Sequence, residues 1–300
     1  MTTAYFMRLL CLCLAAFFLL HLAAGSLMAI LSPLAIRAAE RMTPRRAARF
    51  LFEIRLVPAV FSLLVVIAIC APSYLWLEPR ANVEDVSLPC LAAAFLGSML
   101  WTASFLRVLR AAARSHNVVK SDTSLMAVVG LVHPRLIISR DLLAALPPDE
   151  LLAAIRHEEA HRVSRDNLKR LLMLLTPGIL PGYQGFAALD RAWAKFTEWS
   201  ADDCSVDGDE RRSVSLASAL VRAARLGTSF ATSGLMTSLL GDERDLSQRV
   251  ERLLRCAPPR EEIPSRSRIV TLVLAAMLVV AMLQPATLYS AHRLLEYLTH

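Results

Sequence analysis

The sequence predicts an α-helical membrane protein that carries one polar domain of mainly α (α+β) architecture with a small edge sheet. Hydrophobic residues make up 55% of the chain, and the mean hydropathy of +0.46 is too high for an ordinary soluble protein. The arginines responsible for the net charge of +7 cluster beside apolar stretches. They therefore indicate membrane topology, and we expect no direct binding of nucleic acid.

Four apolar stretches are long enough to cross a lipid bilayer, which needs about 20 helical residues. They cover about residues 5–31, 56–77, 86–106 and 269–288. The first could instead be a signal peptide. Its apolar run is longer than that of most signal peptides and the positive charges follow it, which favours a membrane anchor. We therefore predict four transmembrane helices.

The distribution of arginines predicts how these helices are oriented. The basic loop 36–55 is expected in the cytoplasm, and the acidic turn 78–85 outside. Residues 1–110 then hold three transmembrane helices, 111–267 form a cytoplasmic domain, and 268–300 form the fourth helix and a short tail. Both termini lie outside, and the chain is expected to be an integral, multi-pass protein of the cell (inner) membrane.

The polar domain is expected to begin with a pair of strands, residues 125–132 and 135–139. Pro148, followed by two acidic residues, predicts the first turn of a helix, which we expect to continue to about Leu175. Proline and glycine interrupt the apolar segment 171–189, so a loop packed on the membrane or the spans is expected there. Further helices are expected at 189–204, 213–226 and 246–254.

The sequence His157-Glu158-Glu159-Ala160-His161 lies within the first of these helices. In a helix the i, i+4 spacing turns His157 and His161 to one face, where two imidazoles can bind one metal ion. This HExxH pattern is a zinc peptidase signature, in which Glu158 would act as the general base. The alternative is a solvated helix face.

A catalytic zinc ion usually has three protein ligands and one open position, so a third ligand is expected downstream. Glu198 and Asp202 lie one helical turn apart on a later predicted helix. We predict Glu198 as the third ligand. Asp202 is then placed to accept a hydrogen bond from a ligand histidine and fix its ring orientation. Taken alone, the two carboxylates could equally belong to a solvated helix face.

Two further features have less specific signals. The predicted strand formed by Arg135, Leu136, Ile137, Ile138 and Ser139 could be a substrate edge strand, to which an extended peptide adds itself, or an ordinary sheet edge. Cys70 and Cys90 fall near the same predicted membrane edge. They could pair in an oxidising compartment, but two free thiols are favoured.

Several of these segments resemble the membrane zinc metallopeptidases of the BlaR/MecR antirepressor type. The resemblance covers Arg135–Leu143, Pro148–Leu151, His157–His161 and Arg165–Asn167. Glu198 and Asp202, as ExxxD, match the glutamate-ligand zincins (gluzincins), to which HtpX-type peptidases also belong. The resemblance implies a zincin-like domain with one zinc ion per chain at His157, His161 and Glu198. It also implies that Asp166 is a structural aspartate near the site.

The resemblance also sets expectations about partners. Receptors of this type continue into an extracellular penicillin-binding sensor domain, whereas this sequence stops at His300, so we do not expect it to sense β-lactams directly. The expected partners are the lipid bilayer and a protein substrate, with a transcriptional repressor as one candidate; the oligomeric state stays open. The leading hypothesis is regulated proteolysis. Its alternatives are HtpX-like quality control of membrane proteins and a non-catalytic metal-binding scaffold.

Overall fold

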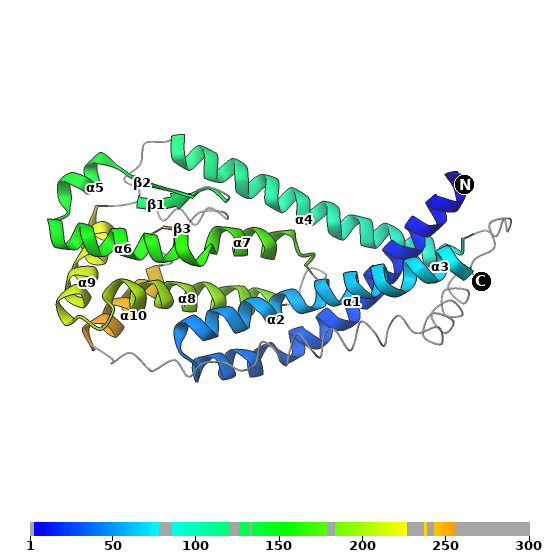
Figure 1. Ribbon diagram of the computed structural model, residues 1–300, viewed down its shortest axis with the longest axis horizontal. Helices are drawn as coiled ribbons and strands as arrows, with labels where there is room; N and C mark the ends of the chain where they lie inside the picture. The colour runs from blue at the N-terminus through cyan, green and yellow to red at the C-terminus, as the bar shows by residue number, and fades with distance from the viewer. Residues whose placement is uncertain are drawn as a thin grey trace.

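The computed structural model describes residues 3–77, 86–120, 126–131, 134–178, 184–226, 237–238 and 243–255. Long helices run side by side along the molecule, and a small sheet with shorter helices lies at one end (Figure 1). Two of the sequence predictions, the fourth transmembrane helix at 269–288 and the acidic turn at 78–85, lie outside the described residues.

Three helices are long and apolar enough to cross a membrane, as predicted, and they support a membrane protein. The first is α1 (Thr3–Glu40). The second begins as α2 (Pro44–Val65) and continues through a π-helical turn, η1 (Val66–Cys70), into α3 (Ala71–Leu77). The third is α4 (Leu88–Lys120). α4 runs without a break through residue 110, the boundary predicted between the membrane part and the domain.

The prediction of a basic loop at 36–55 is wrong in its secondary structure. α1 continues to Glu40, a short turn follows, and α2 begins at Pro44, because proline is well accommodated in the first turn of a helix. Small side chains, including Ala39 and Ala47, are fully buried where the ends of α1 and α2 pack against the aromatic side chains of α8. The arginine-rich segment is thus a helical hairpin in contact with the domain.

The interior of the membrane part is tightly packed. A Cβ atom added at Gly97 of α4 would lie 2.7 Å from the backbone oxygen of Leu14 in α1, so these two helices approach each other closely only because residue 97 has no side chain.

Cys70 and Cys90 are buried in the same apolar cluster and are both free thiols. Of the two alternatives that the sequence left open for this pair, free thiols were the favoured one.

The small sheet is antiparallel, with strand order β2-β1-β3. β1 (Met126–Val129) and β2 (Arg135–Ile138) were predicted, with a register that pairs Met126 with Ile138 and Val129 with Arg135. β3 (Thr237–Ser238) was not predicted and pairs with the other side of β1. β2 therefore lies at one edge of the sheet, as expected, and β1 and β3 pack against α6.

The remaining helices are α5 (Arg140–Ala145), α6 (Pro148–Ser164), α7 (Asp166–Leu175), α8 (Gln184–Val206), α9 (Glu210–Arg225) and α10 (Glu243–Leu254). The single helix predicted from Pro148 to Leu175 is wrong, because Arg165 adopts a left-handed conformation (φ 54°) and divides it into α6 and α7. The loop predicted at 171–189 is also too long, since helices occupy both of its ends. Leu142, Ala154, Leu216 and Leu220 lie at the centre of the domain core.

Candidate metal centre

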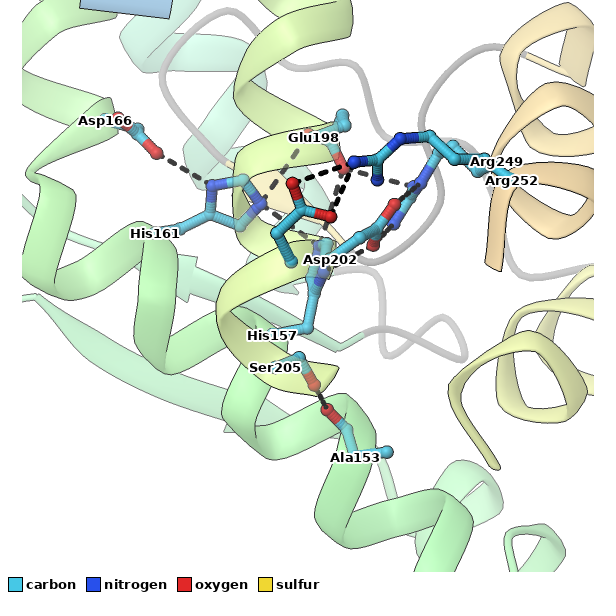
Figure 2. Close-up of polar contacts among 10 residues, drawn as sticks. Ala153, His157, His161, Asp166, Glu198, Asp202, Ser205, Arg249 and Arg252 are labelled. Atoms are coloured by element: carbon cyan, nitrogen blue, oxygen red, sulfur yellow. Dashed lines mark hydrogen bonds and ion pairs between the residues drawn. The ribbon is translucent and has the colours of Figure 1, made fainter. Parts of the chain in front are cut away.

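Two helices bring the three predicted metal ligands together (Figure 2). His157 and His161 lie one turn apart on α6, and their Nε2 atoms are 3.2 Å from each other. Glu198 on α8 faces them, with one carboxylate oxygen 3.5 Å from His157 Nε2 and the other 3.6 Å from His161 Nε2. Ser205 of α8 donates a hydrogen bond of 2.7 Å to the backbone oxygen of Ala153 in α6, which fixes the two helices against each other.

The three side chains fit a zinc ion. In a tetrahedral site with bonds of about 2.05 Å, neighbouring ligand atoms lie about 3.3 Å apart, close to the three distances that separate these donors. One ligand atom from each residue lies within 4.8 Å of the others, and all three residues are buried. Two imidazoles and one carboxylate are also an established donor set for catalytic zinc.

Each ligand histidine is held by a second carboxylate on the opposite side of its ring. His157 Nδ1 lies 2.9 Å from Asp202 Oδ1, and His161 Nδ1 lies 2.8 Å from Asp166 Oδ2. Because a carboxylate only accepts hydrogen bonds, both Nδ1 atoms carry a hydrogen, which leaves the Nε2 atoms, on the side of Glu198, as the positions where a metal ion can replace a proton. Asp202 occupies the place that the sequence predicted for it.

The contact made by Asp166 was not foreseen. On one continuous helix, a residue five positions after His161 would point away from the metal-binding face. The left-handed conformation of Arg165 ends α6 and begins α7, which turns Asp166 back toward His161. Asp166 therefore contacts the ring of a candidate metal ligand directly, and it also binds Lys169 at 2.8 Å.

Arg249 of α10 is a site residue that the sequence analysis missed. Its side chain is 1% exposed and binds both oxygens of Asp202, at 2.9 and 2.7 Å. The same guanidinium lies 3.1 Å from Glu198 Oε2. Arginine suits this position because its planar fork can bind two carboxylates at once. Its position in an amphipathic helix near other arginines gave no sign of this role.

The electrostatics of the site favour a cation between the two rings. Burial alone would lower the pKa of His161, but Glu198 and Asp166 outweigh that effect and raise the pKa to about 10. Burial would raise the pKa of Asp202, yet Arg249 and His157 bring it down to about 2. The carboxylates are thus held in their charged form around two basic nitrogens.

Glu158 lies beside the ligands and is fully buried. Neither of its carboxylate oxygens has a hydrogen-bond partner among the described residues, and burial raises its pKa to about 7. A carboxylate with a pKa near neutrality can take up and release a proton at physiological pH. By contrast, Glu159 points outward and pairs with Arg162 on the surface.

The predicted substrate edge strand, β2, is one residue shorter than expected. Arg135 is exposed, while Leu136, Ile137 and Ile138 are partly buried. The strand ends at Ile138, because the Ser139 side chain accepts a hydrogen bond from the backbone nitrogen of Leu142 and caps α5. Ser139 therefore belongs to a helix cap.

The comparison with protein families agrees with the geometry of the site. Residues 103–237 match the model of peptidase family M48, a segment that contains all three candidate ligands and Glu158. The match supports a metallopeptidase of that family. The likeness to the BlaR/MecR type stays a prediction. No curated protein and no solved structure matches the chain significantly.

Proposed function

We propose that this chain is an integral membrane zinc endopeptidase that hydrolyses peptide bonds with a water molecule. The observation that carries the proposal is the buried convergence of His157, His161 and Glu198 beside Glu158, whose two oxygens lack hydrogen-bond partners among the described side chains. A non-catalytic scaffold could use the three ligands. It would have no use for a buried carboxylate without hydrogen-bond partners next to them, because such a group lowers the stability of the fold and adds nothing to metal binding.

His157, His161 and Glu198 would hold one zinc ion per chain, with Asp202 and Asp166 fixing the two imidazole rings. When bound, zinc would supply a Lewis acid that polarises the peptide carbonyl group and acidifies a nearby water molecule. Glu158 takes the proton from that water molecule on a carboxylate oxygen. It then delivers the proton to the nitrogen of the leaving amine, so that it acts first as general base and then as general acid.

Glu158→Gln tests this proposal, because it keeps the size of the side chain and removes its capacity to exchange a proton. We expect the variant to retain zinc and to lose cleavage of an unstructured protein substrate. Glu159→Gln is the matched control, since its side chain is exposed and paired with Arg162. Equal cleavage by Glu158→Gln and the wild type would contradict the catalytic role, and absence of zinc from every purified form would contradict the metal site.

We further propose that the chain acts in regulated proteolysis, with a transcriptional repressor as a candidate substrate. The support is the sequence resemblance alone. Comparing the proteins cleaved in cells that contain the wild type or Glu158→Gln would test this role. One repressor-like target would agree with it, whereas many damaged membrane proteins would indicate quality control.

An extended segment of the substrate is proposed to add to the edge of the sheet at β2, which has Ile137 at its middle. Backbone hydrogen bonds would then hold the substrate without selecting particular side chains. Ile137→Pro removes one backbone donor from this edge. It should raise KM for an unstructured substrate while zinc binding stays unchanged. An unchanged KM would argue against β2.

The proposed orientation places this domain in the cytoplasm, with four transmembrane helices and both termini outside. Cys204 is exposed on α8 and offers a direct test in a variant whose other cysteines are replaced by serine. A membrane-impermeant maleimide should label Cys204 only after the cell membrane has been opened. Labelling of intact cells would reverse the orientation.

A further inference from the structure

Each of the three candidate membrane helices contacts the short connection that follows α7. Arg107 of α4 donates a hydrogen bond of 3.1 Å to the backbone oxygen of Thr176. His21 of α1 places Nε2 3.1 Å from the backbone oxygen of Pro177, and since a carbonyl oxygen only accepts, Nε2 is the donor. Arg55 of α2 donates to the Thr176 hydroxyl at 3.2 Å. The carbonyl end of α7 is thus bound by cationic and polar donors, which complement the negative end of its dipole.

Arg55 also joins this connection to α8. Its Nε atom lies 2.9 Å from Asp190 Oδ1, and its guanidinium stacks over the Phe186 ring at 4.3 Å from the centroid. The side chain is only 3% exposed. Because a guanidinium is planar and its donors have fixed directions, one residue sets the distance between Thr176 at the end of α7 and Asp190 in α8.

The two helices joined in this way both lead to the metal centre. α7 begins at Asp166, which holds His161, and its ten residues span about 15 Å. α8 continues from Asp190 through Glu198 to Asp202. A helix is stiff over two or three turns, so a shift of the connection near the membrane helices moves the carboxylates at the other ends of α7 and α8.

The close packing of α8 on the membrane part agrees with such a mechanical link. A Cβ atom added at Gly185 would lie 2.7 Å from the Cα atom and the backbone oxygen of Ala29 in α1. α7 lies against α4 and α2, and α8 lies against α2 and α1 (Figure 1). α7 and α8 are therefore both packed directly against the membrane helices.

We propose that Arg55 is a positioning residue of the metal centre, through which the membrane helices set the relative placement of the His161–Asp166 pair and Glu198. This inference rests on the proposed function, because it concerns the same zinc site. A buried arginine at the edge of an apolar span is costly unless its hydrogen bonds are all made. A purely structural role would change the stability of the protein but leave the geometry of the bound metal as it is.

The test compares Arg55→Met with Arg49→Met in the full chain reconstituted in lipid nanodiscs. Arg49 is an exposed arginine on the same helix, so this control makes the same change in charge. The first readout is the visible absorption spectrum of the cobalt-loaded protein, which reports the coordination geometry. The second is zinc affinity, measured by competition with a chromophoric chelator. The third is the thermal unfolding midpoint.

We expect Arg55→Met to alter the cobalt spectrum and to weaken zinc binding by up to about tenfold, the low end of what the loss of a direct contact to a metal ligand costs, because Arg55 acts on the ligands only through α7 and α8. Arg49→Met should behave as the wild type in both respects. Arg55→Lys keeps the charge but offers a single donor group, and it should recover part of the zinc affinity. If Arg55→Met does not fold, the cobalt spectrum of Arg55→Lys decides the question, with an altered spectrum expected.

A cobalt spectrum and a zinc affinity equal to those of the wild type, with only the unfolding midpoint lowered, would overturn the inference and leave the proposed function intact. A wild-type protein that binds no zinc would overturn both. A wild type that binds zinc, with Glu158→Gln inactive and Arg55→Met altered in its cobalt spectrum, is the combined outcome that we expect.

Discussion

Arg249→Met should be among the most destabilising single substitutions outside the metal ligands. Arg249 supplies the positive charge that balances two buried carboxylates, Asp202 and Glu198. Methionine fills a similar volume but leaves both carboxylates without that charge. Breaking a buried ion pair by removing one partner typically costs about 3–5 kcal/mol. The loss here should lie in that range, because both acidic residues are at most 5% exposed.

Arg252→Met is the matched control for this prediction. Arg252 lies on the same helix and pairs with Asp203, but both side chains are partly exposed. Its ion pair and its position over the Trp199 ring, 5.2 Å from the centroid, should together contribute about 1 kcal/mol. Thermal unfolding followed by tryptophan fluorescence should show a midpoint lower by on the order of 10 °C for Arg249→Met, and a much smaller change for the control.

The pH dependence provides a second check on the same substitution. Arg249 helps to hold the pKa of Asp202 at about 2, below the value of about 3.9 expected in an unfolded chain. Asp202 therefore stabilises the fold above about pH 4, and this contribution disappears as the pH falls toward 2. In Arg249→Met the pKa of Asp202 in the folded protein should rise, so its contribution should be smaller and should be completely lost at a higher pH. Equal midpoints for Arg249→Met and Arg252→Met, with the same acid sensitivity, would refute the reasoning.

Three further predictions concern the metal site and the packing of α8. Asp166→Asn and Asp202→Asn should each weaken zinc binding by about 10–100-fold in a chelator competition assay, and unchanged affinity would show that neither carboxylate orients a ligand ring. Gly185→Ala should destabilise the protein by about 1–3 kcal/mol, measured by thermal unfolding, because the new Cβ atom would lie 2.7 Å from Ala29; an unchanged midpoint would mean that α8 and α1 are not in close contact. Because Glu198 and Asp166 raise the pKa of His161 to about 10, His161 carries a proton at pH 7 that zinc must displace. Zinc affinity should therefore rise with pH, and adding zinc to a weakly buffered sample should release protons; no release would contradict this assignment.

The sequence by itself determined the local features of this protein. The i, i+4 spacing of His157 and His161 fixes both rings on one face of any helix that contains them. The length of the apolar stretches predicted four helices that can cross a membrane, and three of them lie among the described residues. The spacing of Glu198 and Asp202 also put both carboxylates on one helix face. These are consequences of helix geometry, which depends on residues close together in the chain.

Only the tertiary structure decided which distant groups surround the metal centre. The left-handed Arg165 turns Asp166 toward His161, and the packing of α10 buries Arg249 against Glu198 and Asp202. The same holds for Arg55, which the sequence placed in a basic loop and the structure places between α7 and α8. The sequence gives no periodic signal that Arg249 and Arg55 are buried. Their acidic partners, Asp202 and Asp190, lie 47 and 135 residues away along the chain. The sequence could thus predict the candidate ligands, whereas the contacts that hold them depend on the fold.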